Sequence, residues 1–166
     1  MQNMLNELFD ILGQQVRVYE NILKLSKDKT EIIVAGKVAE LENLVKLEQA
    51  LVVQIGRLEQ QREVIAGKIA AILKLDKQSL TISTLMKHLD KSQQEFLKSY
   101  EQKMTKILDE LKNTNDLNAK LIKHSLEYIE FSMNVITNAS VPGNVYEGKG
   151  NTRESRGTKS IFDVKL

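Results

Sequence analysis

The feature that most constrains this fold is an unbroken alternation of three- and four-residue steps between core-type positions in two long stretches. The second seam runs from Leu41 to Ile72, and the first consists of Leu5, Phe9, Leu12, Val16, Tyr19, Leu23, Ser26, Thr30 and Ile33. This heptad spacing is typical of long helices that pack side by side. Gly36 lies between the two stretches and can adopt the left-handed conformation that ends a helix. The spacing therefore predicts helices over 2–34 and 38–75, joined by a short turn that makes them antiparallel.

A third long helix is predicted over 92–138, because Ser92 and Glu95 form a capping-box pattern at its start. The connector before it contains a short helix, 84–89, with Ser83 as its cap. We therefore predict an all-α fold: an elongated, antiparallel bundle of three long helices, coiled-coil-like, with a short connector helix. Residues 1–138 would form this domain. The segment 139–166 is rich in glycine and holds the single proline, which predicts a flexible C-terminal tail.

Composition excludes several classes of function. The 24 basic and 22 acidic side chains are interspersed, which argues against nucleic-acid binding. The chain has no cysteine, no apolar run long enough for membrane insertion and no signal-peptide pattern at its start, so we expect a cytoplasmic protein. Neither His88 nor His124 stands in a Glu-x-x-His motif, and no nucleophile–base pattern is visible. We expect no metal, no cofactor and no enzymatic activity.

Part of the third helix is apolar over too much of its circumference. Between Leu121 and Ile136 the large apolar side chains cover an arc of about 220°, whereas packing on one neighbour needs only about 100°. The surplus must be covered by a third element, a second copy of the chain or another protein. The third helix is also longer than the other two, so this apolar end would overhang the turn at Gly36.

Two core-type positions of the second helix are charged, Glu48 and Arg62. They lie too far apart along one helix to pair with each other. Each therefore needs a partner on another helix or an opening to water, and Ser26, Asn115 and Asn118 are the candidate partners. We interpret the two charges mainly as features that fix the register of the bundle.

At the third helix the sequence resembles the FlgN family of flagellar type III export chaperones. The similarity includes Leu111, the segment 118–136, and the ending with Tyr146, Gly148, Gly150 and 160–163. It also includes a pattern in the second helix, formed by Gly36, Leu41, Leu44, Glu48, Leu58 and Arg62. Together these stretches cover nearly the whole chain.

The resemblance implies a cytosolic chaperone without ATPase activity. It would bind the C-terminal amphipathic segments of the hook-associated proteins FlgK and FlgL, keep them from associating early, and deliver them to the export apparatus. The expected client-binding residues are those of the apolar arc: Leu121, Ile122, Ser125, Leu126, Tyr128, Ile129, Phe131, Ser132, Met133, Val135 and Ile136. The alternative is a structural protein without a client, a coiled-coil spacer or a homodimer formed through the same arc.

Overall fold

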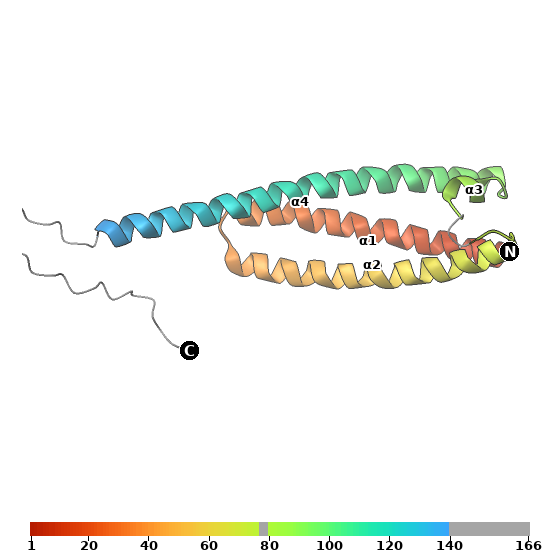
Figure 1. The fold of residues 1–166 in the computed structure, drawn as a ribbon, viewed down its shortest axis with the longest axis horizontal. Helices are drawn as coiled ribbons and strands as arrows, with labels where there is room; N and C mark the ends of the chain where they lie inside the picture. The colour runs from red at the N-terminus through yellow and green to blue at the C-terminus, as the bar shows by residue number, and fades with distance from the viewer. Residues whose placement is uncertain (77–79, 140–166) are drawn as a thin grey trace, which may run out of the picture. The chain divides into compact units, whose positions relative to one another are not determined.

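The computed structural model describes residues 1–76 and 80–139, and every regular element in these ranges is a helix (Figure 1). The elements are α1 (Gln2–Val34), α2 (Val38–Ile72), α3 (Ile82–Met86) and α4 (Lys91–Ala139). The predicted all-α class is therefore confirmed. The chain divides into two units after residue 129, so Met1–Ile129 and residues 130–139 are described separately. The predicted tail lies outside the described residues from residue 140 onward.

The turn between α1 and α2 is closed by Gly36. Its φ of +66° lies in the left-handed region that side chains disfavour. The Gly36 N–H donates to the carbonyl of Ile33, and the Lys37 N–H donates to the carbonyl of Ile32, both at 3.1 Å. These two bonds form a Schellman motif, which satisfies carbonyls that the end of α1 would otherwise leave open. The glycine thus ends α1 where the sequence predicts.

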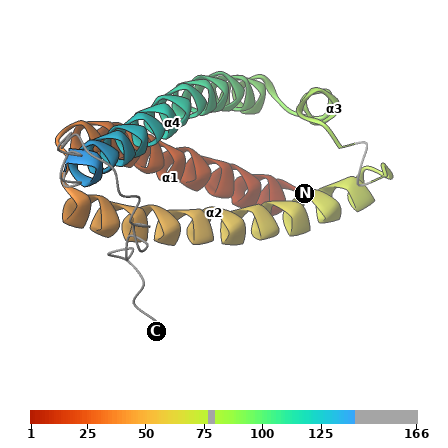
Figure 2. The same ribbon diagram turned by 60° about the vertical axis from the view of Figure 1, so that its left-hand side comes forward.

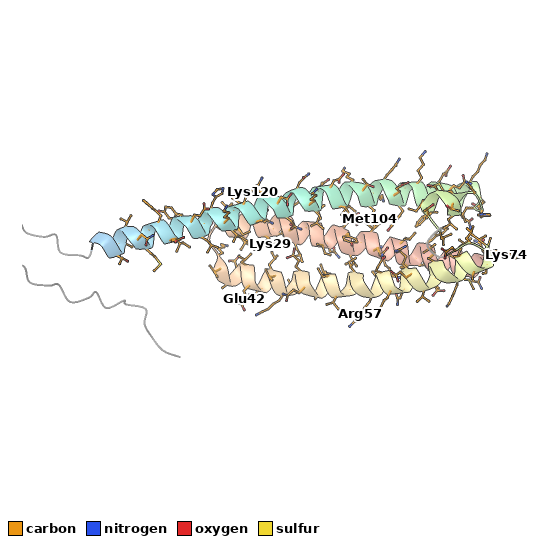
Figure 3. All side chains as sticks on the ribbon, viewed as in Figure 1. Lys29, Glu42, Arg57, Lys74, Met104 and Lys120 are labelled. Carbon is orange, nitrogen blue, oxygen red and sulfur yellow. The ribbon has the colours of Figure 1, made fainter. Side chains whose placement is uncertain are left out.

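Side-chain contacts between α1 and α2 fix the direction of α2. Gln15 Nε2 donates to Glu59 Oε2 at 3.0 Å, and Lys29 Nζ lies 2.7 Å from Glu48 Oε2 (Lys29 is labelled in Figure 3). Residues later in α1 therefore meet residues earlier in α2. The two helices run in opposite directions, with α1 lying between α2 and α4 in both ribbon views (Figures 1 and 2).

The contacts of α4 show the opposite order. The Tyr100 hydroxyl donates to Gln15 Oε1 at 3.3 Å, and Ser26 Oγ donates to Asn115 Oδ1 at 2.7 Å. Residues later in α1 meet residues later in α4, so these two helices run in the same direction.

The buried strip of α1 differs from the predicted seam. Leu5, Leu12 and Ser26 are buried as expected, whereas seam residues such as Phe9 and Val16 are only half-buried. The strip includes further residues that the alternating pattern missed: Leu8, Ile11, Gln15, Val18 and Ile22. The reason is that α1 contacts α2 on one flank and α4 on the other, so its buried strip is centred between two neighbours rather than on one.

The connector helix begins and ends earlier than predicted. The residue that caps α3 is Thr81 rather than Ser83, because the Thr81 hydroxyl accepts a hydrogen bond from the Thr84 N–H at 3.2 Å. The connector contributes Leu85 and Leu89 to the core. Burial of these two leucines holds α3 against the long helices.

The cap of α4 also lies earlier than predicted. Asp90 Oδ1 accepts a hydrogen bond from the Gln93 N–H at 2.9 Å, and Gln93 Oε1 accepts one from the Asp90 N–H at 3.2 Å. Asp90 and Gln93 thus form the capping box assigned from the sequence to Ser92 and Glu95. An aspartate and a serine two residues apart both qualify as caps, and sequence alone does not choose between them.

The end of α2 falls at Ile72, three residues before the predicted end. Lys74 adopts a left-handed φ of +56°, and the Leu75 N–H donates to the Ala70 carbonyl at 2.9 Å (Lys74 is labelled in Figure 3). This is the same type of helix ending as at Gly36, but a lysine occupies the position that favours glycine.

Candidate functional site

A buried layer of polar side chains joins the C-terminal part of α1 to α4. Ser26 is fully buried, and Asn118 is only 3% exposed. Asn118 Nδ2 donates to the Ser26 carbonyl at 2.9 Å, and Thr30 Oγ1 donates to Asn118 Oδ1 at 2.7 Å. Ser26 Oγ donates to Asn115 in turn. Because these groups satisfy one another, the layer is stable in the core and fixes the register of α1 on α4.

The predicted partners of the two charged seam residues are therefore wrong. Glu48 pairs with Lys29, and both side chains are largely buried. Arg62 Nε donates to Glu59 Oε2 at 2.8 Å, one turn away on the same helix. The hydrogen bond from Arg62 lowers the pKa of Glu59. Each of the two charges is thus neutralised by a side chain of opposite charge. The polar layer is held instead by hydrogen bonds among Ser26, Thr30, Asn115 and Asn118.

The face of α4 that α1 covers continues beyond the end of α1. Thr30 donates a hydrogen bond to Asn118 of α4, and α1 ends one turn later, at Val34. Further along α4, Ile122 is 39% exposed, Leu126 61% and Ile129 53%. Large apolar side chains are therefore exposed where the covering helix stops. Spaced four and three residues apart, they lie on one side of the helix.

A groove lies between this part of α4 and the α1–α2 turn. It is lined by Ile32, Ile33, Gly36, Lys37, Val38, Leu41, Ile122, Ser125 and Leu126. The lining is almost entirely apolar, and Val38 is 76% exposed. The structure thus brings Ile122, Ser125 and Leu126, expected from the sequence, next to turn residues that the sequence analysis did not select. The signal for Val38 was weak, because it is one apolar residue preceding the seam of α2.

The other predicted residues of α4 up to residue 129 have different surroundings. Leu121 is half-buried, Tyr128 is 71% exposed, and the hydroxyl of the exposed Ser125 donates to the Leu121 carbonyl at 2.9 Å. This bond satisfies the Ser125 hydroxyl within its own helix, which leaves a small side chain on the groove surface.

Residues 130–139 form the described part of the second unit. Four of the predicted residues here are exposed: Phe131, Met133, Val135 and Ile136. Ser132 is half-buried. Exposure makes contact with another molecule possible, and the binding role of all the predicted residues remains a prediction.

Charged side chains lie beside the groove in pairs of opposite sign. Lys37 pairs with Glu40 at 3.0 Å, and Lys123 lies 3.8 Å from Glu127. His124 Nδ1 lies 3.3 Å from the same glutamate. In the described ranges there is no cluster of three or more residues suited to hold a metal ion. Lys37 is the charged residue of the groove lining, and Glu40 offsets its charge.

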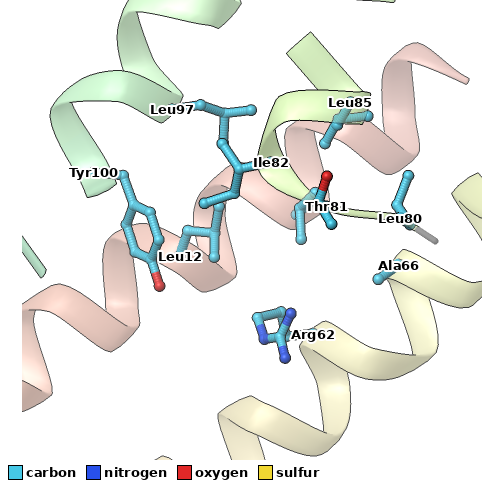
Figure 4. A pocket seen from close by; sticks show the side chains of 10 residues that line it. Leu12, Arg62, Ala66, Leu80, Thr81, Ile82, Leu85, Leu97 and Tyr100 are labelled. Atoms are coloured by element: carbon cyan, nitrogen blue, oxygen red, sulfur yellow. The ribbon is translucent and has the colours of Figure 1, made fainter. Parts of the chain in front are cut away.

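A separate cavity lies at the other end of α1, between the long helices and the connector (Figure 4). It is lined by Leu8, Leu12, Arg62, Ala66, Leu80, Thr81, Ile82, Leu85, Leu97 and Tyr100. Burial raises the pKa of Tyr100, and its hydroxyl donates to Gln15. The hydrogen bond to Glu59 raises the pKa of Arg62. The polar groups of this cavity are therefore engaged with partners within the chain.

The described residues form an all-α protein whose longest helix carries an exposed apolar face, and none of its described helices could cross a membrane. The model of the FlgN protein family matches residues 1–154, so the chain belongs to the FlgN family. This is a family of chaperones rather than enzymes, and membership implies a role of the flagellar export chaperone kind.

One relative is the "Uncharacterized protein YvyG" of Bacillus subtilis (strain 168), which is 29% identical over 119 residues, or 72% of each chain. No solved structure matches this chain.

Proposed function

We propose that this protein is a cytoplasmic export chaperone that binds the C-terminal amphipathic helices of the hook-associated proteins FlgK and FlgL. It would keep these segments from associating prematurely and deliver them to the type III export apparatus. We further propose that the long helices form the antiparallel bundle expected from the sequence over residues 1–138, which would hold the binding face rigidly. The contacts of α1 with α2 and α4 support this arrangement.

The observation that carries the proposal is the exposed apolar face of α4 beside the groove. Ile122, Leu126 and Ile129 expose aliphatic side chains at the spacing with which one helix contacts another. An amphipathic client helix would bury these side chains together with its own apolar stripe. Such burial is favourable by about 25 cal/mol per Å² of apolar surface, before the cost of ordering the client.

The sequence pattern extends the proposed contact to the predicted residues between 131 and 136. They are included because most of them are large, apolar and exposed. Met133 suits a surface that accepts more than one client, because its unbranched side chain adapts to different partners.

The proposal is tested by calorimetric titration of the full chain with the C-terminal segments of FlgK and FlgL from the same genome. We expect saturable binding to at least one segment. Ile129→Asp should weaken it at least about a hundredfold, because a carboxylate would be desolvated against apolar groups. The matched control is Val53→Asp on α2, since Val53 is 56% exposed and lines no part of the groove.

Binding of neither segment, or equal binding by Ile129→Asp and the unaltered chain, would contradict the proposal. The structural alternative, a homodimer through the same face, predicts instead that the unaltered chain self-associates and that Ile129→Asp makes it monomeric. Sedimentation equilibrium over a range of concentrations distinguishes the two functions.

A further inference from the structure

The groove at the α1–α2 turn continues an interface that already exists within the protein. Asn118 of α4 contacts α1 through Thr30, and seven residues later the same side of α4 carries Ser125. Two helical turns separate them, about 10.5 Å. Only one turn of α1 follows Thr30. The side of α4 against which α1 packs therefore extends past the last residue of α1.

Ile32 and Ile33 at the end of α1 line the groove and form an apolar wall beside this uncovered part of α4. The carbonyls of Ile32 and Ile33 already accept hydrogen bonds from the turn. A helix brought against this end would not strip water from these two carbonyl groups, a cost that would otherwise oppose contact. The wall is also wider than α1 itself, because Val38 at the start of α2 lines the same groove.

The exposure of Val38 is unexplained by the packing of α2. The first turn of a helix favours acidic or polar residues, yet Val38 is apolar and 76% exposed. Across the groove, Ser125 presents a small side chain between Ile122 and Leu126. A small residue flanked by aliphatic ones permits close approach of another helix, as at other helix–helix contacts with small central residues.

We infer that the client helix docks end-on to the α1–α2 turn, continuing α1 along α4, with one end held between Val38 and Ser125. This inference rests on the proposed function. It adds to the exposed face of α4 a second wall, formed by Ile32, Ile33 and Val38. It specifies an amphipathic helix with a small residue opposite Ser125 and large aliphatic residues on either side of it. The partner would thus be recognised by the position of its end as well as by its apolar stripe.

Val38→Asn tests the second wall, with Val34→Asn as its matched control. Val34 lies on the other side of the same turn, is 72% exposed and does not line the groove. We expect Val38→Asn to weaken calorimetric binding of the client segment about tenfold, equal to 1.4 kcal/mol, and Val34→Asn to change it less than twofold. Thermal unfolding of both variants checks that the turn is intact.

The outcomes separate this inference from the proposed function. If Ile129→Asp abolishes binding while Val38→Asn binds as the unaltered chain does, the second wall is refuted and the α4 site stands. If the unaltered chain binds neither client segment, the proposed function fails and the inference fails with it.

A direct readout is available because the sequence contains no cysteine. A bimane fluorophore attached at Val38→Cys should change its emission when the client segment is added, and one at Val34→Cys should not. Equal changes at both positions would refute end-on docking. A change at Val38→Cys on concentrating the protein alone would identify a second copy of the chain as the occupant and overturn the inference.

Discussion

Removing the side chain of Asn118 should destabilise the protein by about 3 kcal/mol. The Asn118→Ala variant loses the hydrogen bond to the Ser26 carbonyl and the one from Thr30. Each contributes about 1 kcal/mol net. The void left at a site that is 3% exposed adds about 0.5–1 kcal/mol. For a chain of this length the loss corresponds to a fall in Tm of roughly 6–12 °C.

The assay is urea unfolding followed by circular dichroism, with Thr30→Val and the double variant completing a double-mutant cycle. We expect a coupling of about 1 kcal/mol between positions 30 and 118, because they share one hydrogen bond. Thr30 can turn toward the Ser26 carbonyl, 3.2 Å away, which limits the cost of losing Asn118. A loss below about 1 kcal/mol for Asn118→Ala, or full additivity, would refute the role of this layer.

Three further predictions concern the helix ends and one ion pair. Lys74→Gly should raise the free energy of unfolding by about 1 kcal/mol, because lysine is strained at a φ of +56°; unchanged stability in urea would contradict this. Gly36→Ala should lower it by about 1 kcal/mol for the same reason, although a Cβ there would meet no neighbouring atom. Since the pKa of Glu59 is lowered in the folded state, its stabilising effect is present above its ordinary pKa near 4.5 and is lost as the pH falls through the folded-state value. Glu59→Gln should therefore flatten the fall in stability below about pH 5, and parallel pH profiles for the two proteins would show that the pair contributes nothing.

The sequence predicted the elements whose signals are local. The bounds of α1 follow from its heptad spacing and Gly36, and the structure has them at the predicted residues. Helix caps were less predictable, because Asp90, Ser92 and Thr81 all belong to residue types that accept a hydrogen bond from a helix N-terminus.

The contacts of α1 required the tertiary structure. The predicted seam assumes that α1 packs against one neighbouring helix, and it therefore omits Gln15 and Ile22. Both are buried because α1 contacts two helices. The charge partners were missed for a related reason. Lys29 lies outside the predicted seam but close enough to α2 to pair with Glu48.

The candidate site could be predicted in part. The apolar composition of α4 near Ile129 was evident, because it exceeds what one neighbouring helix can cover. The second wall was not evident, since Val38 and Ser125 are far apart in sequence and meet only where the turn lies against α4. The central proposal is that the exposed face of α4, which includes Ile129, binds the client helix.

The measurement that tests this proposal most directly is hydrogen–deuterium exchange of the unaltered chain, with and without a saturating FlgK or FlgL C-terminal segment. We predict that peptides covering 121–129 exchange at least about tenfold more slowly when the client is bound, because bound helix must open before it exchanges. Peptides from the middle of α2 should not change. Protection confined to α2, or none in 121–129 under conditions where binding is saturated, would contradict the assignment of the client site to α4.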